Sequence, residues 1–159
     1  MKSIMKNKLS MAMVALCATG IIGSTGALAD TASVAVSAKV IGHCAFNVSN
    51  GVVAFGDLNP GTPGDVTGTV TQPTFWCTKN ATWGITDNDG VNASEGAQRM
   101  KHASLAEYIP YSFSYTIGGS GTGKNTPITM DIASTVLNAD FLDASEGNYA
   151  DTVTLTITP

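Results

Sequence analysis

The feature that most constrains this chain is a period-2 alternation of apolar and polar residues, clearest in the final segment, "YADTVTLTITP". There Val153, Leu155 and Ile157 alternate with threonines. Successive side chains of a strand point to opposite faces, so the pattern places one apolar face on a core and one threonine face in solvent. Threonine is β-branched and fits a half-exposed pleat. The segment therefore predicts a strand with one buried face.

Similar patterns run through the rest of the chain. Strands are predicted at 66–71, at "TFWCT" (74–78), at "TWGIT" (82–86) and at "YSFSYTI" (111–117). The last of these has Tyr111, Phe113, Tyr115 and Ile117 on one face. "DNDG" at 87–90 predicts a turn, because its residues tolerate left-handed backbone. Short alternating strands separated by turn residues indicate an all-β protein.

Two local signals are less regular. Asn50-Gly51 lies between two apolar runs, which predicts a tight β-hairpin. Residues 93–108 are the only stretch with a helix-like composition, and Gly96 weakens it. With about seven short strands expected and no convincing helix, the sequence favours an immunoglobulin-like β-sandwich.

The first residues have the pattern of a secretory signal peptide. Three lysines precede the apolar stretch 11–22, and "Ala27-Leu28-Ala29" has the small residues of a cleavage site. We expect a signal peptide at 1–29 and a mature chain of one domain, with no membrane span after cleavage. A membrane anchor is the alternative, but the apolar stretch is short for one.

Charge excludes one class of partner. After residue 29 the sequence has five basic and twelve acidic residues, which gives a net charge of −7. A nucleic-acid surface needs a cluster of Lys and Arg, so no nucleic-acid partner is expected.

The mature chain holds two cysteines, Cys44 and Cys77. An even pair in an exported chain indicates a disulfide. A metal site that includes His43 is the alternative, although the spacing does not match a zinc motif.

The residues offer little for catalysis or cofactors. His43 and His102 are the only histidines of the mature chain, and no nucleophile-elbow motif is present. The segment 118–125 nearly matches a phosphate-binding loop, but Asn125 replaces the Ser or Thr and a strand-like stretch follows. We therefore expect no enzyme, no cofactor and no metal.

The mature chain opens on a second alternating segment, "DTASVAVSAKVIGHC". Val34, Val36, Ala38 and Val40 would share one face of a strand at 30–42. A terminal strand with one apolar face can complete the sandwich of its own chain or add to the sheet of a neighbour. These residues alone leave both possibilities open.

The mature chain resembles the spore coat protein U family, which includes subunits of archaic chaperone–usher pili. The residues that carry the resemblance are the alternating strand before Cys44, then "FGDLNP" (55–60), "WCT" (76–78), "RM" (99–100), "YSFSYT" (111–116) and "GNYADTVTLTITP" (147–159). The resemblance covers Asp30 to Pro159. At 138–146 the sequence departs from many relatives, which leaves the conformation of that loop open.

The resemblance implies an incomplete sandwich, at 43–159, that lacks its last strand. In the family, a periplasmic chaperone fills the open groove first. At an outer-membrane usher, the N-terminal strand of the next subunit then takes the place of the chaperone. We therefore expect a structural shaft or adaptor subunit of a cell-surface fimbria that supports adhesion and biofilm formation. Val34, Val36, Ala38 and Val40 would be the donor residues. Val153, Leu155 and Ile157 would line the acceptor groove.

Two other functions remain possible on the residues. The chain could be a self-complemented secreted binding module, for instance for carbohydrate, with Trp76 or Trp83 as an exposed platform. It could also be a secreted enzyme, which the missing catalytic constellation disfavours. The sequence does not distinguish a major from a minor subunit, nor does it identify a receptor.

Overall fold

The computed structural model describes residues 28–159, and residues 38–159 form one compact unit. The predicted signal peptide at 1–29 lies almost entirely outside the described residues. In the described part of the chain, no helix is long and apolar enough to cross a membrane.

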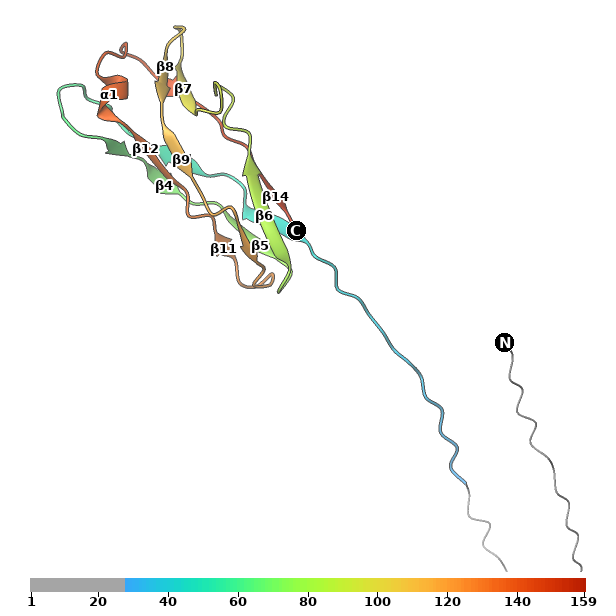
Figure 1. Cartoon of the computed structure of the whole chain (residues 1–159). Helices are drawn as coiled ribbons and strands as arrows, with labels where there is room; N and C mark the ends of the chain where they lie inside the picture. The colour runs from blue at the N-terminus through green and yellow to red at the C-terminus, as the bar shows by residue number, and fades with distance from the viewer. Residues whose placement is uncertain (1–27) are drawn as a thin grey trace, which may run out of the picture. The chain divides into compact units, whose positions relative to one another are not determined.

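The compact unit is built from short strands and one short helix (Figure 1). The elements are β1 (Cys44–Val48), β2 (Val52–Ala54), β3 (Val66–Thr67), β4 (Thr69–Thr71), β5 (Thr74–Cys77), β6 (Thr82–Asp87), β7 (Arg99–His102), β8 (Tyr108–Pro110), β9 (Ser112–Ser114), β10 (Gly118–Ser120), β11 (Ile128–Thr129), β12 (Ala133–Val136), α1 (Asn138–Phe141), β13 (Tyr149–Ala150) and β14 (Leu155–Thr158).

In the described part of the chain the strands form five small sheets, with the strand orders β1-β5-β11, β2-β4, β3-β12-β9, β10-β6-β14 and β13-β7-β8. All of these pairs are antiparallel. This arrangement confirms the predicted all-β, immunoglobulin-like sandwich.

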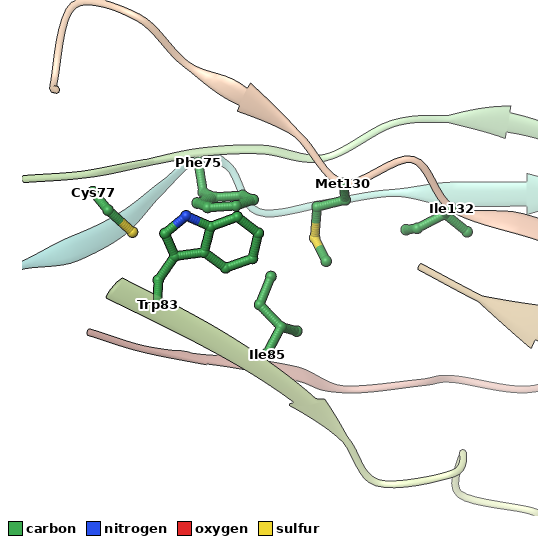
Figure 2. Packing of buried hydrophobic residues seen from close by; sticks show 6 residues of the cluster. All are labelled: Phe75, Cys77, Trp83, Ile85, Met130 and Ile132. Carbon is green, nitrogen blue, oxygen red and sulfur yellow. The ribbon is translucent and has the colours of Figure 1, made fainter. Parts of the chain in front are cut away.

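A first core cluster lies between β5 and β6, as Figure 2 shows. Its buried members are Phe75, Cys77, Trp83, Ile85, Met130 and Ile132. The rings of Phe75 and Trp83 meet edge to face with centroids 4.8 Å apart. Phe75 and Trp83 belong to "TFWCT" and "TWGIT", which are strands as predicted.

A second core cluster, Ile109, Val136 and Phe141, lies at the α1 end of the same unit. Phe141 comes from the short helix α1, inside the segment 138–146 whose conformation the sequence left open. The helix positions this one large side chain, which is only 2% exposed. The stretch 93–108, in contrast, contains no helix. Strand β7 occupies its centre and pairs with β8 and β13.

The predicted hairpin at Asn50-Gly51 is wrong. β1 and β2 do not pair with each other: both run antiparallel to one continuous segment, β1 along β5 and β2 along β4. Pro73 separates β4 from β5 and has no N–H to donate. Gly51 passes so close to Pro73 that a Cβ would lie 2.8 Å from the proline Cγ. Asn50 and Gly51 therefore form an irregular stretch opposite Pro73. Neither residue has the positive φ that a type I′ turn needs.

Two further boundaries differ from the sequence prediction. β14 begins at Leu155, so Val153 precedes the regular strand. Ile117 was predicted to share the inward face of Tyr111, Phe113 and Tyr115, but its side chain is 73% exposed. The chain changes partner there, because the Ile117 carbonyl accepts a hydrogen bond from the Ile85 N–H at 2.8 Å.

The predicted disulfide is present, with the Sγ atoms of Cys44 and Cys77 2.03 Å apart. The two residues face each other in the β1–β5 ladder. The bond fixes the first residue of β1 to the central strand of its sheet.

Breaking this bond should cost stability. On the chain-entropy relation, a bridge between residues 33 apart contributes about 4 kcal/mol. We expect the Cys44→Ser/Cys77→Ser variant to lose about that free energy of unfolding in a denaturant titration. Mass spectrometry of unreduced peptides from the wild-type protein should show the linked pair. Two free thiols there would contradict the assignment.

A carboxylate ties two loops together near the second core cluster. Ser145 Oγ and N donate to Glu107 at 2.8 and 3.2 Å, and the Tyr149 hydroxyl donates at 3.2 Å. These bonds, that of the Ser145 hydroxyl above all, lower the pKa of Glu107 from 4.5. A lowered carboxyl pKa stabilises the fold above the unfolded-state value, and the effect is lost as the pH falls through the folded-state value.

Glu107→Gln should therefore lower the melting temperature at neutral pH. The difference from wild type should shrink as the pH falls from 4.5 through the lower folded-state pKa, because wild-type Glu107 then becomes protonated in the folded protein too. Thermal unfolding followed by circular dichroism at several pH values measures this. Glu146→Gln is the matched control, since the exposed Glu146 carboxylate accepts no hydrogen bond among residues 28–159. A pH-independent difference for Glu107→Gln would contradict the expectation.

Candidate functional site

A groove opens on the compact unit between the chain from β1 to β2 and the chain from β13 to β14. Its volume is about 600 Å³. The lining residues are Phe46, 49–53, Phe55, Pro73, Met100, Tyr111, Phe113, Ile132 and 149–155. The groove thus follows two strand edges that belong to different sheets.

The wall from β13 to β14 alternates strictly. Tyr149, Asp151, Val153 and Leu155 are half-buried, whereas the residues between them are exposed. The inward face of this wall therefore has four positions, three apolar and one acidic. The pattern that predicted the last strand continues through this wall, although residues 151–154 are not themselves in a ladder.

The floor and the opposite wall belong to the core itself. Phe46, Val53, Phe113 and Leu155 pack on the first core cluster, and Phe55, Met100, Tyr111 and Tyr149 pack on the second. All eight side chains are only half-buried. Large apolar residues of a finished core are normally buried, so the groove is a seam where the core is open to solvent.

Strand edges border this seam. β14 pairs with β6 and with no other strand among the described residues, and β1 and β2 pair only with β5 and β4. An edge strand presents unpaired N–H and C=O groups that can template another strand. The groove therefore combines open apolar surface with unused backbone hydrogen-bonding groups.

Asp151 is the one charged side chain that lines the groove. Its Oδ1 accepts from the Asn92 N and Nδ2 atoms at 3.1 and 3.0 Å, and its Oδ2 accepts from the Tyr111 hydroxyl at 2.7 Å. Burial and the hydrogen bond to Asp151 raise the pKa of the Tyr111 phenol, which keeps it a neutral donor. Three donors hold the carboxylate in place.

The turn at 87–90 supports the same wall. Asp89 and Gly90 have φ of 59° and 95°, the left-handed backbone predicted for this turn. Asn88 Oδ1 accepts from the Thr154 N–H at 2.8 Å, and the Thr152 carbonyl accepts from the Val91 N–H at 3.1 Å. The wall is thus fixed by a loop where it is not paired in a sheet.

Of the three predicted groove residues, Val153 and Leu155 line the groove. Ile157 does not line it, and like Leu155 it packs on the first core cluster. A role for these residues in accepting a strand stays a prediction. The sequence reasoning missed Asp151 and the opposite wall of Phe46, Val53 and Phe55. Asp151 continues the period-2 pattern backward from Val153, which is the signal that points to it.

The predicted donor segment, in contrast to the groove, is exposed to solvent and is not paired in a sheet. Residues 28–43 take part in no strand pairing of the described structure. Val34, Val36 and Val40 are 83%, 90% and 82% exposed, and Ala38 is exposed as well. A role for these residues in strand donation stays a prediction.

The two tryptophans do not form an exposed platform. Trp83 is 5% exposed and belongs to the first core cluster. Trp76 is half-buried, with the His43 ring 5.3 Å away and Lys124 Nζ 5.5 Å from its ring centroid. Among residues 28–159 no group of three or more His, Cys, Asp or Glu side chains is arranged to hold a metal ion.

Comparison with known proteins identifies one family. The Spore Coat Protein U domain family matches residues 30–156. A search of curated proteins found no match. One similar solved structure is the CsuC–CsuE chaperone–tip adhesion subunit pre-assembly complex from archaic chaperone–usher Csu pili of Acinetobacter baumannii. The identity is 20% and the TM-score 0.42, over 74% of this chain and 40% of the matched chain.

The family match covers nearly all of the described residues, including both walls of the groove and the exposed segment that precedes β1. The resemblance seen in the sequence motifs is thereby confirmed. The chain belongs to the Spore Coat Protein U domain family.

Proposed function

We propose that this chain is a structural subunit, shaft or adaptor, of an extracellular fimbria assembled by donor-strand exchange. One observation carries the proposal: a single chain contains both an open groove in its core and an exposed alternating segment of the kind that fills such a groove. The groove accepts a strand from outside, and the segment 30–42 is given to a neighbour. Family membership supports the same role.

The energetics favour such an exchange. Burying Val34, Val36 and Val40 contributes roughly 1.5–3 kcal/mol for each side chain. Backbone hydrogen bonds to the two groove edges add about 1 kcal/mol apiece, against the cost of ordering the segment. The contact is head-to-tail, because the donor and the acceptor are different surfaces. A head-to-tail contact does not close on itself and builds a filament.

The same groove explains why partners are needed before assembly. An open apolar seam in a free subunit favours aggregation. We propose that a periplasmic chaperone covers it after export, that an outer-membrane usher exchanges the chaperone for the next subunit, and that the finished fibre supports adhesion and biofilm formation at the cell surface. In this role the chain performs no catalysis.

The alternative is a self-complemented binding module, in which residues 30–42 complete the sandwich of their own chain. Such a protein would be a monomer without any chaperone. Size-exclusion chromatography of the purified mature protein distinguishes the two functions, since a fibre subunit forms polymers or aggregates and the module stays monomeric.

A charge in the groove should block assembly. Leu155→Asp and Val153→Asp each place an unpaired carboxylate where an incoming strand would be buried. We expect either variant to abolish fibres and chaperone binding, as measured by electron microscopy and co-purification. Val153→Asp keeps the experiment decisive if Leu155→Asp fails to fold, because Val153 is not part of the first core cluster.

Thr156→Asp is the matched control, since Thr156 is exposed on the outer face of β14 and does not line the groove. It should assemble normally. Fibres at normal yield from the Val153→Asp variant would contradict the groove as the acceptor site.

Removing residues 30–41 should abolish strand donation and leave strand acceptance intact. The truncated subunit still has its groove, so it should fold on its chaperone, join a growing fibre and stop it. Mixing it with wild-type subunits should shorten the fibres in proportion to its share, as measured by electron microscopy. Val36→Asp should act in the same way, because it would place a charge in the core of a neighbour.

The outcome for a module differs. If residues 30–42 complete their own sandwich, the deletion should prevent folding, and a synthetic peptide of residues 30–42 should rescue only the truncated protein. A full-length protein that is already a heat-stable monomer, with a melting temperature unchanged by the peptide, would overturn the proposed function.

A further inference from the structure

We propose that the strand donor is a second copy of this chain and that it enters the groove in one register, with Ala38 opposite Asp151. The proposal rests on the proposed function and goes beyond it, because it names the partner and a residue that determines specificity. It follows from comparing the inward face of the groove wall with the apolar face of the exposed segment.

The two faces have the same spacing. The wall presents Tyr149, Asp151, Val153 and Leu155 at every second residue. The segment presents Val34, Val36, Ala38 and Val40 at every second residue as well. In an antiparallel pair, residues directly opposite each other lie on the same face and touch. Four wall positions thus meet four donor positions.

Asp151 determines the register, that is, which donor residue lies opposite which wall residue. Its carboxylate is fixed by hydrogen bonds from Asn92 and Tyr111, so it cannot swing away from an incoming side chain. A valine pressed against it would remove the remaining water from a charged group and would supply no hydrogen bond in its place. Ala38 is the one short side chain among the four donor positions and leaves that space free.

The direction follows from the same match. With the donor antiparallel to the wall, Ala38 opposite Asp151 puts Val36 on Val153, Val34 on Leu155 and Val40 on Tyr149. Each valine then meets an apolar wall residue. With the donor parallel to the wall, Gly42 would face Leu155, and Val34 would face Gly147, which lies outside the lining residues.

Ala32 also has a short side chain on the apolar face, but it does not offer an equal solution. Placing Ala32 opposite Asp151 in the antiparallel direction would put Asp30 on Val153 and carry Val36 past Tyr149. That register buries a second carboxylate against an apolar side chain and leaves two valines outside the groove. In the antiparallel direction, the register with Ala38 is the one that places a valine on each of the three apolar wall residues.

This complementarity lies within one sequence, so the chain that gives the strand can be identical to the chain that accepts it. We therefore infer that the protein forms fibres of its own copies, as the repeating subunit of a shaft.

Disulfide trapping between separate chains tests the register. One full-length copy carries Val36→Cys and the other Val153→Cys, so a covalent dimer can form only between copies. The native Cys44–Cys77 bond is formed before mild oxidation. We expect a dimer on a non-reducing gel for this pair and for Val34→Cys with Leu155→Cys. Val34→Cys with Val153→Cys is the control that is shifted by one pair.

Each outcome is informative. Dimers from the first two pairs and little from the shifted pair support the register. A shifted pair that links more strongly, or wild-type polymers with no linked pair at all, would overturn the register while leaving the fibre function intact. A protein that forms no polymer with itself but accepts a strand from another source would overturn the self-copy partner. Failure to accept any strand would overturn the proposed function.

A second measurement tests the role of Asp151. Ala38→Val in the donor should slow assembly on a wild-type groove about tenfold, because the added methyl groups press on the fixed carboxylate. On an acceptor that carries Asp151→Ala, the preference between the two donors should shrink or reverse. The ratio of the two assembly rates, measured with both donors on the same acceptor, does not depend on any general loss of stability in that acceptor. An unchanged ratio on the Asp151→Ala acceptor would show that Asp151 does not select the donor.

Discussion

The structure depends on a core that is open along one seam. Two clusters of apolar residues fill the sandwich, but their outer members between β1–β2 and β13–β14 are only half-buried. A protein interior is normally packed to crystal-like density, so such a seam leaves apolar area in water and lowers stability. Both edges are tied to the sheets on one side only, which leaves backbone groups without partners. A strand that covers the seam supplies the apolar cover and the hydrogen bonds together.

The polar network around Asp151 explains how an uncovered edge keeps its shape. Residues 151–154 have no sheet partner, yet hydrogen bonds to Asn88, Val91 and Asn92 hold their backbone and side chains. The loop from 87 to 92 thus substitutes for a neighbouring strand. A groove fixed in advance costs less ordering entropy when a strand binds than a groove that must form on binding.

Much of the fold could be predicted from the sequence, because a period of two residues is a strong local signal. The strands at "TFWCT" and "TWGIT" were predicted as strands, the C-terminal strand was predicted with its buried face, and the disulfide followed from the cysteine pair. Of the three acceptor-groove residues predicted from the resemblance and the same alternation, Val153 and Leu155 line the groove of the structure and Ile157 does not. What the sequence did not predict depends on long-range contacts. Asn50-Gly51 has the local pattern of a hairpin, but Pro73, distant in sequence, lies against it and decides its geometry. Phe141 completes the second core cluster from a short helix that has no periodic signal of its own.

The position of the disulfide has a mechanical consequence. The bond joins Cys44, where β1 begins, to Cys77 in the central strand of the same sheet. In a fibre of the proposed kind, tension passes from one subunit to the next through residues that precede Cys44. A pull on that segment reaches a covalent crosslink before it reaches the hydrogen bonds of β1. The load is therefore passed directly to the central strand, and β1 cannot be peeled from its sheet one residue at a time.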